Sequence, residues 1–440
     1  MAGPPGGRSA SNSWTLCSCA GADVQAARQA PAPALTQPTS NLPAGLMVWL
    51  LALLLGIQPV TTDLYLPALP ALASSLGAPM AHAQLTLSAL LLAFGGSQLV
   101  WGPLSDRFGR RPVLLCGLTA YTLASAAAAS SAMAPTMALL IVWRVLQGAA
   151  MGAVVMSARA MVRDVYAPTE GARVMSRGLT GLGVLACISA PLGGLLSELY
   201  DWRAALGALA VFGAACWTLV ALRFEETLRH KNLAALRPAV LLATWRGILK
   251  NPTFLAFSAL SAASYGGLFT FLATSSFVFI GVLGLSKAQY GAVMFFNSLF
   301  YIAGTYLCRR LLPRWGVAKS VAVAAGFSLV GGTTMGVLVW CGVHTLWAIL
   351  LPQLLFMVGH GIHQPCGQTG AVGPFPQAAG AASAVNGFLM MAVAFGVGSW
   401  LGQHMDGSVR PLAYGVWLSS VLIALTAWTL VQKYGEPERV

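Results

Sequence analysis

The turn that decides the fold reads Gly102-Pro103-Leu104-Ser105-Asp106-Arg107-Phe108-Gly109-Arg110-Arg111. It lies between two long apolar runs, at residues 84–104 and 113–132, and it crowds one carboxylate and several guanidinium groups into a few positions. Gly109 can adopt the backbone conformations that a tight bend requires and that other residues avoid. Two interpretations stay open: an ordinary ion-paired turn on the side of a membrane where basic residues collect, or a latch whose pairing changes with conformation.

The composition around this turn is that of a membrane protein. Hydrophobic residues make up 57% of the chain and charged residues only 8%, whereas soluble domains carry about 25% charged residues. Apolar runs of about 20 residues, long enough for a helix to cross the hydrocarbon, recur about twelve times. We place these spans at residues 46–69, 84–104, 113–132, 135–156, 176–196, 202–222, 252–283, 288–307, 320–341, 345–364, 379–400 and 411–431.

The spans fall into two groups, which predicts an all-α membrane protein with twelve transmembrane helices in two six-helix halves. The expected halves are residues 46–222 and 252–433, joined by a charged cytoplasmic linker at 223–251. A weak internal repeat supports this division, because Pro313-Arg314-Trp315-Gly316 follows the eighth span as Asp106-Arg107-Phe108-Gly109 follows the second. Residues 1–45 are rich in Ala, Pro, Gly, Ser and Gln, so we expect a disordered N-terminal tail and no cleaved secretory signal.

The charges predict how the spans are oriented. The chain has 25 Lys and Arg against 12 Asp and Glu, a balance that in a soluble protein would suggest nucleic acid. Here the cause is simpler, since cytoplasmic loops of membrane proteins collect Lys and Arg. With the N-terminus inside, nearly all the basic residues fall on the inner side, except Arg203, Lys287, Arg410 and the mid-span Arg144. We therefore expect cytoplasmic N- and C-termini and no nucleic-acid partner.

Arg144 lies about nine residues into its span, near mid-depth at 1.5 Å per residue. A charged side chain there is costly unless it is paired, so it should face the interior of the bundle and line a transport path. The alternative is a structural clamp that hydrogen-bonds backbone carbonyls between helices.

Asp63 is the only acidic residue inside the predicted spans, between Pro59 and Pro67. Burial disfavours an ionised carboxylate and nearby positive charge favours it, so a group poised between these effects can load and release a proton. The alternative is a helix cap at a kink, because Asp is a favoured capping residue.

Other candidates come from the later spans. His360 and His363 are three residues apart and share a helix face; with Gln364 they could line an inner cavity or form a hydrogen-bonded packing pair. Two imidazoles are too few for a zinc site, and the cysteines are scattered, so we expect no metal and no disulfide framework. An aromatic cavity wall is a further possibility, with packing or lipid-facing roles as the alternative; its candidates are Phe94, Tyr265, Phe269, Phe271 and Phe296.

These motifs resemble the major facilitator superfamily. Residues 102–111 are similar to the motif of its loop between spans 2 and 3, and Arg144-Val145-Leu146-Gln147-Gly148 resembles the span 4 motif of its proton-coupled drug antiporters. Thr62-Asp63-Leu64-Tyr65-Leu66-Pro67 resembles the span 1 signature of the bicyclomycin/chloramphenicol resistance (Bcr/CflA) subfamily. Ala190-Pro191-Leu192-Gly193-Gly194 resembles the antiporter motif of span 5, with Ala190 in place of its first glycine.

The resemblance implies a bacterial inner-membrane transporter that exports drug-like small molecules in exchange for protons. It implies Asp63 as the proton carrier with Arg144 as its electrostatic partner, and a conformational latch made of Gly102, Asp106, Arg107, Gly109, Arg110 and Arg111. It also implies an antiporter-type motif at Pro191, Gly193 and Gly194, and a cavity between the halves near mid-membrane. Residues expected to line this cavity are Tyr65, Gln147, Tyr265, Phe269, His360, His363 and Gln364.

We expect substrate, protons and membrane lipid to be the only partners, with no cofactor and a monomeric protein. One rival interpretation is a facilitator for a small metabolite, which uptake coupled to proton inflow would indicate. Rivals of other classes are a membrane-embedded enzyme and a channel. They are disfavoured because the sequence has neither a catalytic constellation near a membrane face nor a repeated selectivity segment.

Overall fold

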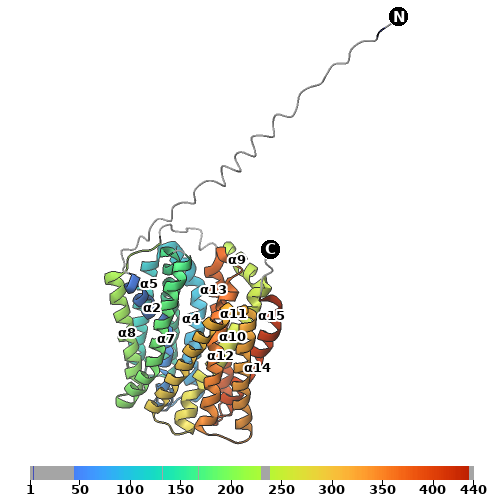
Figure 1. The fold of residues 1–440 in the computed structure, drawn as a ribbon. Helices are drawn as coiled ribbons and strands as arrows, with labels where there is room; N and C mark the ends of the chain where they lie inside the picture. The colour runs from blue at the N-terminus through green and yellow to red at the C-terminus, as the bar shows by residue number, and fades with distance from the viewer. Residues whose placement is uncertain (1–2, 4–43, 131, 167, 229–237, 436–440) are drawn as a thin grey trace. The chain divides into compact units, whose positions relative to one another are not determined.

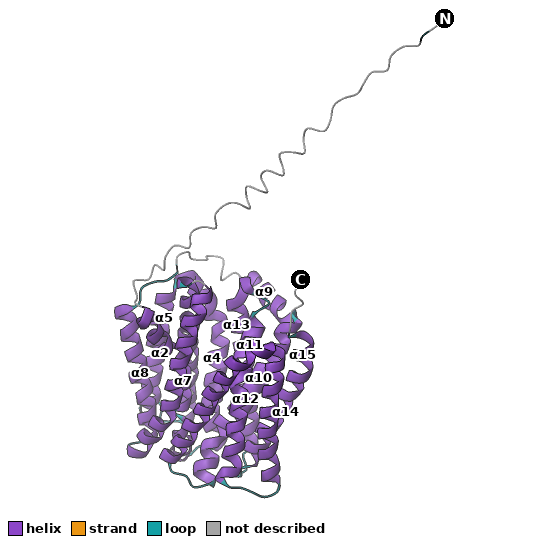
Figure 2. Ribbon diagram, in the orientation of Figure 1, coloured by secondary structure: helices purple, strands orange, loops and turns teal. Residues whose placement is uncertain are grey.

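The computed structural model describes residues 3, 44–130, 132–166, 168–228 and 238–435, and within these residues every regular element is a helix (Figure 2). Residues Ser40–Val440 form one compact unit. Its first half contains α2 (Ala44–Asp63), η1 (Leu66–Ala68), α3 (Leu69–Ser75), α4 (Met80–Phe108), α5 (Arg110–Ala129), α6 (Met137–Val165), α7 (Pro168–Leu199) and α8 (Trp202–Arg223). The predicted tail, residues 1–45, lies outside the described residues apart from Gly3 and the start of α2.

The second half follows a short helix, α9 (Pro238–Lys250). It contains α10 (Pro252–Ser276), η2 (Phe277–Val282), α11 (Lys287–Trp340), α12 (Leu346–Val372), η3 (Pro376–Ala378), α13 (Ala379–His404), α14 (Arg410–Leu425), η4 (Thr426–Leu430) and α15 (Val431–Tyr434). Several helices begin at a residue whose side chain accepts a backbone N–H of the first turn, which satisfies donors that a helix start leaves free. These caps are Thr136, Asp201, Asn251, Ser286 and Thr345.

The twelve predicted spans are confirmed. Within the described residues, eleven helices are long and apolar enough to cross a membrane. The eighth and ninth spans both lie in α11, whose 54 residues would reach about 80 Å if straight, far beyond one bilayer. Gly316 interrupts it with φ 72° and ψ −178°, so α11 crosses twice and the eleven spans make twelve crossings.

The long helices run up and down between two ends of the bundle (Figure 1). We call one the Gly109 end, because α4 passes into α5 there through Gly109 (φ 114°); Gly316 turns α11 at the same end. The opposite Gly77 end contains the α3–α4 turn, and left-handed glycines recur in its turns at Gly77, Gly284, Gly342 and Gly407. Such φ values are accessible to glycine at little cost.

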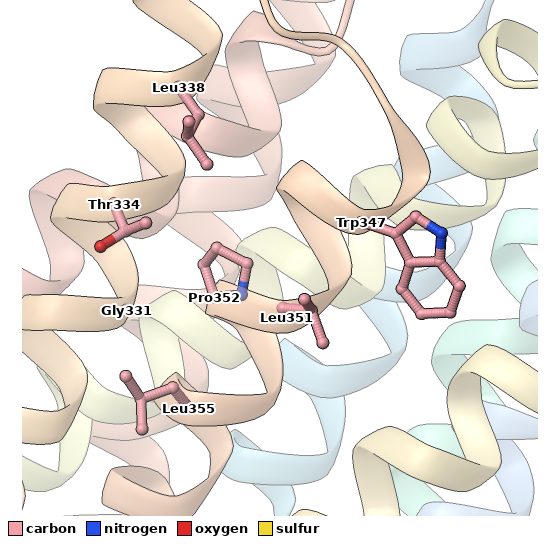
Figure 3. A pocket seen from close by; sticks show the side chains of 7 residues that line it. All are labelled: Gly331, Thr334, Leu338, Trp347, Leu351, Pro352 and Leu355. Carbon is pink, nitrogen blue, oxygen red and sulfur yellow. The ribbon is translucent and has the colours of Figure 1, made fainter.

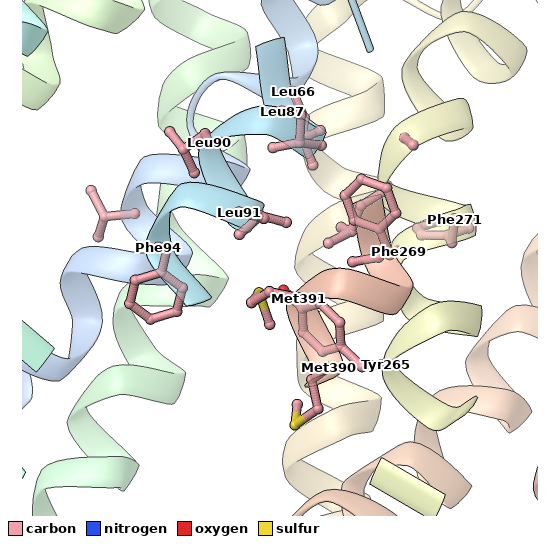
Figure 4. Packing of buried hydrophobic residues seen from close by; sticks show 14 of the residues in the cluster. Leu66, Leu87, Leu90, Leu91, Phe94, Tyr265, Phe269, Phe271, Met390 and Met391 are labelled. Atoms are coloured by element: carbon pink, nitrogen blue, oxygen red, sulfur yellow. The ribbon is translucent and has the colours of Figure 1, made fainter. Parts of the chain in front are cut away.

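The two halves meet along two long helix pairs, α4 with α13 and α7 with α11. Figure 4 shows the first of these seams, where Leu87, Leu91 and Phe94 of α4 lie opposite Met390 and Met391 of α13, with side chains of α10 alongside. At Gly95 a Cβ would lie 2.6 Å from that of Met391. Small residues let helices approach closely in this way, so the seam is tight enough to couple movements of the two halves.

Candidate functional site

Arg144 is fully buried in the middle of α6 and sits at the centre of a polar network in the first half. Its Nη1 donates to Oε1 of Gln147 at 2.5 Å, and its Nη2 lies 3.4 Å from the backbone carbonyl of Thr61. The guanidinium carbon is 4.4 Å from the ring centroid of Tyr65, a cation–π contact that gains strength when desolvated. The side chain therefore ties α6 to the last turn of α2 and to the segment that follows it.

Hydroxyl and amide groups extend this network to neighbouring helices. Gln147 donates through Nε2 to Oγ of Ser125 at 2.6 Å, and the hydroxyls of Tyr121 and Thr61 are 2.6 Å apart. The Tyr65 hydroxyl is 2.9 Å from that of Thr86 on α4. Tyr65 and Gln147, predicted to line the cavity, are both fully buried in this network.

Asp63 is the last residue of α2, at the point where the first span breaks before η1. Its side chain is almost completely buried, and Oδ1 accepts the Thr62 hydroxyl at 2.9 Å. Tyr65 and Ala68, the N-cap positions of the two helices that follow, have no side-chain cap bond. The break is thus present without a capping role for Asp63.

Asp63 and Arg144 are close along the network but are not paired with each other. Neither residue takes part in the two ion pairs found in the described part of the chain. Arg144 instead contacts the carbonyl of Thr61, two residues before Asp63, and its Nε has no hydrogen-bond partner among the described residues. Of the two interpretations of Arg144, the clamp on a backbone carbonyl is visible in the structure, and it does not preclude a role in transport.

The predicted latch is a connected ionic network at the Gly109 end. Arg110 lies between two carboxylates, with its Nη1 2.6 Å from Oδ1 of Asp106 and its Nε 2.7 Å from Oδ2 of Asp164 on α6. It also donates to the hydroxyl of Ser105. Charge-assisted bonds of this length are among the stronger polar contacts in proteins, so Arg110 fastens the start of α5 to the ends of α4 and α6.

Glu226, in the linker, completes this network and was not singled out from the sequence. Its two carboxylate oxygens accept the backbone N–H groups of Arg110 and Arg111 at 2.9 and 3.1 Å. A negative charge at a helix N-terminus is favourable, and Gly109 leaves room for it, since a Cβ there would clash with Glu226. Arg111 also donates to the Ala221 carbonyl of α8.

The remaining predicted latch residues, Arg107 and Gly102, make fewer contacts in this network. Arg107 stacks over Phe108 at 5.5 Å and is outside both ion pairs of the described residues. Gly102 lies within α4, where a Cβ would be 3.7 Å from Met156 on α6. The structure therefore brings Asp106, Gly109, Arg110 and Arg111 together and leaves Arg107 at the edge.

The antiporter-type motif lies where α7 meets the second half, towards the Gly77 end. A Cβ at Gly193 would collide with the Leu64 carbonyl, and one at Gly194 would lie 2.5 Å from the Lys287 carbonyl. Pro191 packs against Gly291 of α11. These three positions therefore allow α7 to contact both the residue after Asp63 and the start of α11.

Two hydrogen bonds reinforce this contact through the ends of α7 and α11. Lys287 Nζ donates to the Ser197 carbonyl at 2.6 Å, and Oε2 of Glu198 accepts the N–H of Ala288 at 3.0 Å. Lys287 places a positive charge near the last carbonyls of α7, and Glu198 places a negative charge at the first N–H groups of α11. The dipole of each helix stabilises the charge at that end. The halves are thus joined at the Gly77 end.

The histidine candidates occupy separate environments in α12. His360 Nδ1 is 2.9 Å from the Ser264 hydroxyl of α10, whereas neither ring nitrogen of His363 has a hydrogen-bond partner in the structure. Gln364 donates to the Ser261 carbonyl at 3.1 Å. All three are buried within the second half.

The aromatic candidates divide between the seam and the surface. Tyr265 and Phe269 of α10 are buried beside α4 and α13 (Figure 4). Phe94 and Phe271 are also buried, but Phe296 is 47% exposed on α11, so the expectation that it belongs to a cavity wall is not met. Figure 3 shows a separate apolar groove between α11 and α12, lined by Gly331, Thr334, Leu338, Trp347, Leu351, Pro352 and Leu355. None of the predicted site residues lines it.

The sequence pattern described as the Major Facilitator Superfamily matches residues 51–430. This chain belongs to the major facilitator superfamily. The resemblance drawn from its motifs is thereby confirmed, and the relatives agree with it. The chain is 30% identical over 396 residues to multidrug resistance protein D of Escherichia coli K12, covering 89% of this chain and 98% of that protein.

Other relatives have similar names. A chloramphenicol resistance protein of Pseudomonas aeruginosa is 29% identical over 371 residues, covering 84% of this chain and 82% of that protein. A bicyclomycin resistance protein homolog of Haemophilus influenzae is 25% identical over 394 residues, covering 87% and 95%. The fold is similar to that of the Escherichia coli xylose transporter XylE in a partially occluded inward-open conformation, with a TM-score of 0.70 at 12% identity, covering 90% and 99%.

The halves also make polar contacts with each other near both ends. At the Gly77 end, Gln84 of α4 donates to the Ala273 carbonyl of α10 at 3.2 Å. At the Gly109 end, Arg159 of α6 lies 3.4 Å from the Ser383 hydroxyl of α13. Hydrogen bonds thus join the halves at both ends.

Proposed function

We propose that this protein exports drug-like small molecules across the bacterial inner membrane in exchange for protons, by alternating access. The observation that carries the proposal is Asp63, the one carboxylate far from either end of the spans, in a chain whose relatives are named for multidrug, chloramphenicol and bicyclomycin resistance. The Gly109 end faces the cytoplasm in this proposal, with both termini on that side, because the basic loops collect there.

Asp63 is placed where a change of charge can alter the contact between halves. It ends α2, and the next residue contacts Gly193 of α7, the helix that packs against α11 of the second half. An ionised carboxylate buried there requires compensation by positive charge, hydrogen bonds or water. Protonation removes that requirement, and the balance between inward- and outward-facing states shifts.

Arg144 is the buried positive charge nearest to this break along the network, and we propose that it serves as the electrostatic partner of Asp63. In the structure it holds the Thr61 carbonyl. The substrate cavity opens alternately at each end between residues 46–222 and 252–433, which move as two bodies joined by the linker 223–251. Tyr265, Phe269, His360, His363 and Gln364 supply its lining from the second half.

In this mechanism the proton gradient is the energy source, no cofactor takes part, and a monomer suffices. A resistance panel in an efflux-deficient bacterial host tests the proposal. Expression should raise resistance to several drugs, including chloramphenicol, and an uncoupler that collapses the proton gradient should abolish the effect. A host that gains no resistance, but takes up a metabolite together with protons, would point to the alternative facilitator.

A further inference from the structure

The linker helix α9 is amphipathic in a way that packing against the protein does not explain. It reads Pro-Ala-Val-Leu-Leu-Ala-Thr-Trp-Arg-Gly-Ile-Leu-Lys and packs against α10 and α13. Ile248 is buried, and Leu241, Thr244 and Trp245 are half-buried, a spacing that places all four on one side of a helix. This side is the one that faces the transporter.

A second apolar side of α9 is left uncovered by the described residues of the protein. Leu242 is 61% exposed and Leu249 is 43% exposed; seven residues apart, they lie on nearly the same line along the helix. The half-buried Trp245 lies between this line and the protein-facing side. Arg246 and Lys250, both exposed, lie beside the line of Leu242 and Leu249, on the side away from Trp245. No residue of α9 is acidic.

The position of α9 in the fold places this side next to lipid. Asn251 caps α10, which enters the membrane-spanning part of the chain at Pro252, so the C-terminal end of α9 lies at the membrane boundary at the Gly109 end (Figure 1). Leu255, in the first turns of α10, is 45% exposed. Exposed leucines thus lie on both sides of Asn251, with Leu249 before it and Leu255 after it.

We propose that α9 lies in the headgroup region of the inner leaflet, with Leu242 and Leu249 in the acyl boundary and Arg246 and Lys250 bound to the phosphates of anionic phospholipids. A short helix with Leu and Trp on one side and basic residues beside them is typical of interfacial helices. Lys and Arg placed beside a span are attracted to anionic lipid, and long basic side chains reach from the apolar boundary to the headgroups.

This placement anchors the linker to the inner leaflet of the bilayer through α9. Its first part is held to the first half by Glu226, and α9 packs on the second half. Lipid bound to α9 therefore restrains the second half relative to the membrane plane while the first half moves.

Photo-crosslinking from α9 tests the apolar contact. The full chain carries the photoreactive residue benzoylphenylalanine in place of Leu249, and is reconstituted in vesicles of phosphatidylcholine and phosphatidylglycerol. Val240, which is 53% exposed but lies on the far side of the helix from Leu242, provides the matched control position. We expect lipid adducts from position 249 at several times the yield from position 240. Equal yields, or adducts to protein alone from position 249, would overturn the placement.

Retention of phosphatidylglycerol after detergent extraction, measured by native mass spectrometry, tests the charge contact. The double variant Arg246→Gln/Lys250→Gln should retain at least roughly fivefold less of this lipid, the effect expected of one basic residue at an anionic surface. Arg8→Gln/Arg28→Gln removes the same charge from positions outside the spans and should have little effect. An equal loss in both variants would mean that net charge alone attracts the lipid, and competition by free glycerol phosphate would mean a soluble-anion site; either result would refute the proposal.

Discussion

The Nη2 atom of Arg144 lies 3.4 Å from the backbone carbonyl of Thr61 and so connects mid-α6 to the last turn of α2. The contact falls two residues before Asp63, at the point where the first span breaks. A fully buried guanidinium that holds this turn can respond to the charge of the neighbouring carboxylate without forming a permanent ion pair with it. Such a pair would have to be broken in every cycle.

Arg144→Lys should abolish efflux although it keeps the charge. An ammonium group cannot reach Gln147, Thr61 and the Tyr65 ring together, because it lacks the planar fork of a guanidinium. The buried Gln147 oxygen would lose its donor, at a cost of about 1–3 kcal/mol. Efflux assays combined with thermal unfolding in detergent measure both effects, with the exposed Arg410→Lys as control. Full efflux by Arg144→Lys would show that charge alone is required.

Asp164→Asn should destabilise the protein more than Asp106→Asn. Both carboxylates bind Arg110, but the Asp164 side chain is 18% exposed and the Asp106 side chain is 47% exposed. We expect a loss of about 1.5–3 kcal/mol for the more buried charged bond and less than about 1 kcal/mol for the exposed one. Asp106→Asn should nevertheless reduce transport at normal membrane levels if the pair works as a latch. Normal transport would make it a plain structural turn.

Glu226→Ala should loosen the linker from the first half. Its carboxylate accepts two N–H groups at the start of α5, a capping role worth about 1 kcal/mol. Limited proteolysis should then cut the linker faster in Glu226→Ala than in the wild type, whereas the adjacent exposed Glu225→Ala should behave like the wild type. The same cleavage rate in both variants would argue against the cap.

Gly194→Ala should open the Gly77 end. The added methyl would lie 2.5 Å from the Lys287 carbonyl of the second half, and overpacking of this kind costs about 1–3 kcal/mol. We expect higher labelling at this end by a membrane-impermeant thiol reagent, with a cysteine introduced for Ser197, and loss of transport. Gly207→Ala, where a Cβ meets nothing within 4 Å, is the matched control. Unchanged labelling would mean that Gly194 does not close this end.

The spans could be predicted because apolar runs of membrane length leave a strong local signal, and the turn at Gly316 was visible as a repeat of the turn at Gly109. Glu226 was missed because it lies 116 positions from Arg110, in a polar linker where nothing local distinguishes it. A contact of Arg144 with backbone carbonyls was one of its two interpretations, but the partner, the Thr61 carbonyl, could not be predicted because every residue carries such a group.

Drug-induced proton release by Asp63→Asn tests the central claim most directly. Inverted membrane vesicles with an imposed pH gradient are given chloramphenicol, and drug accumulation and proton release are followed together. Thr62→Val is the matched control, because it removes the hydroxyl bonded to Asp63 and leaves the carboxylate in place. We predict that the wild type and Thr62→Val exchange drug for protons, that Asp63→Glu retains partial exchange, and that Asp63→Asn reaches the membrane but exchanges neither. Exchange by Asp63→Asn at the wild-type rate would contradict the account and make His360 or His363 the next candidate for the proton carrier.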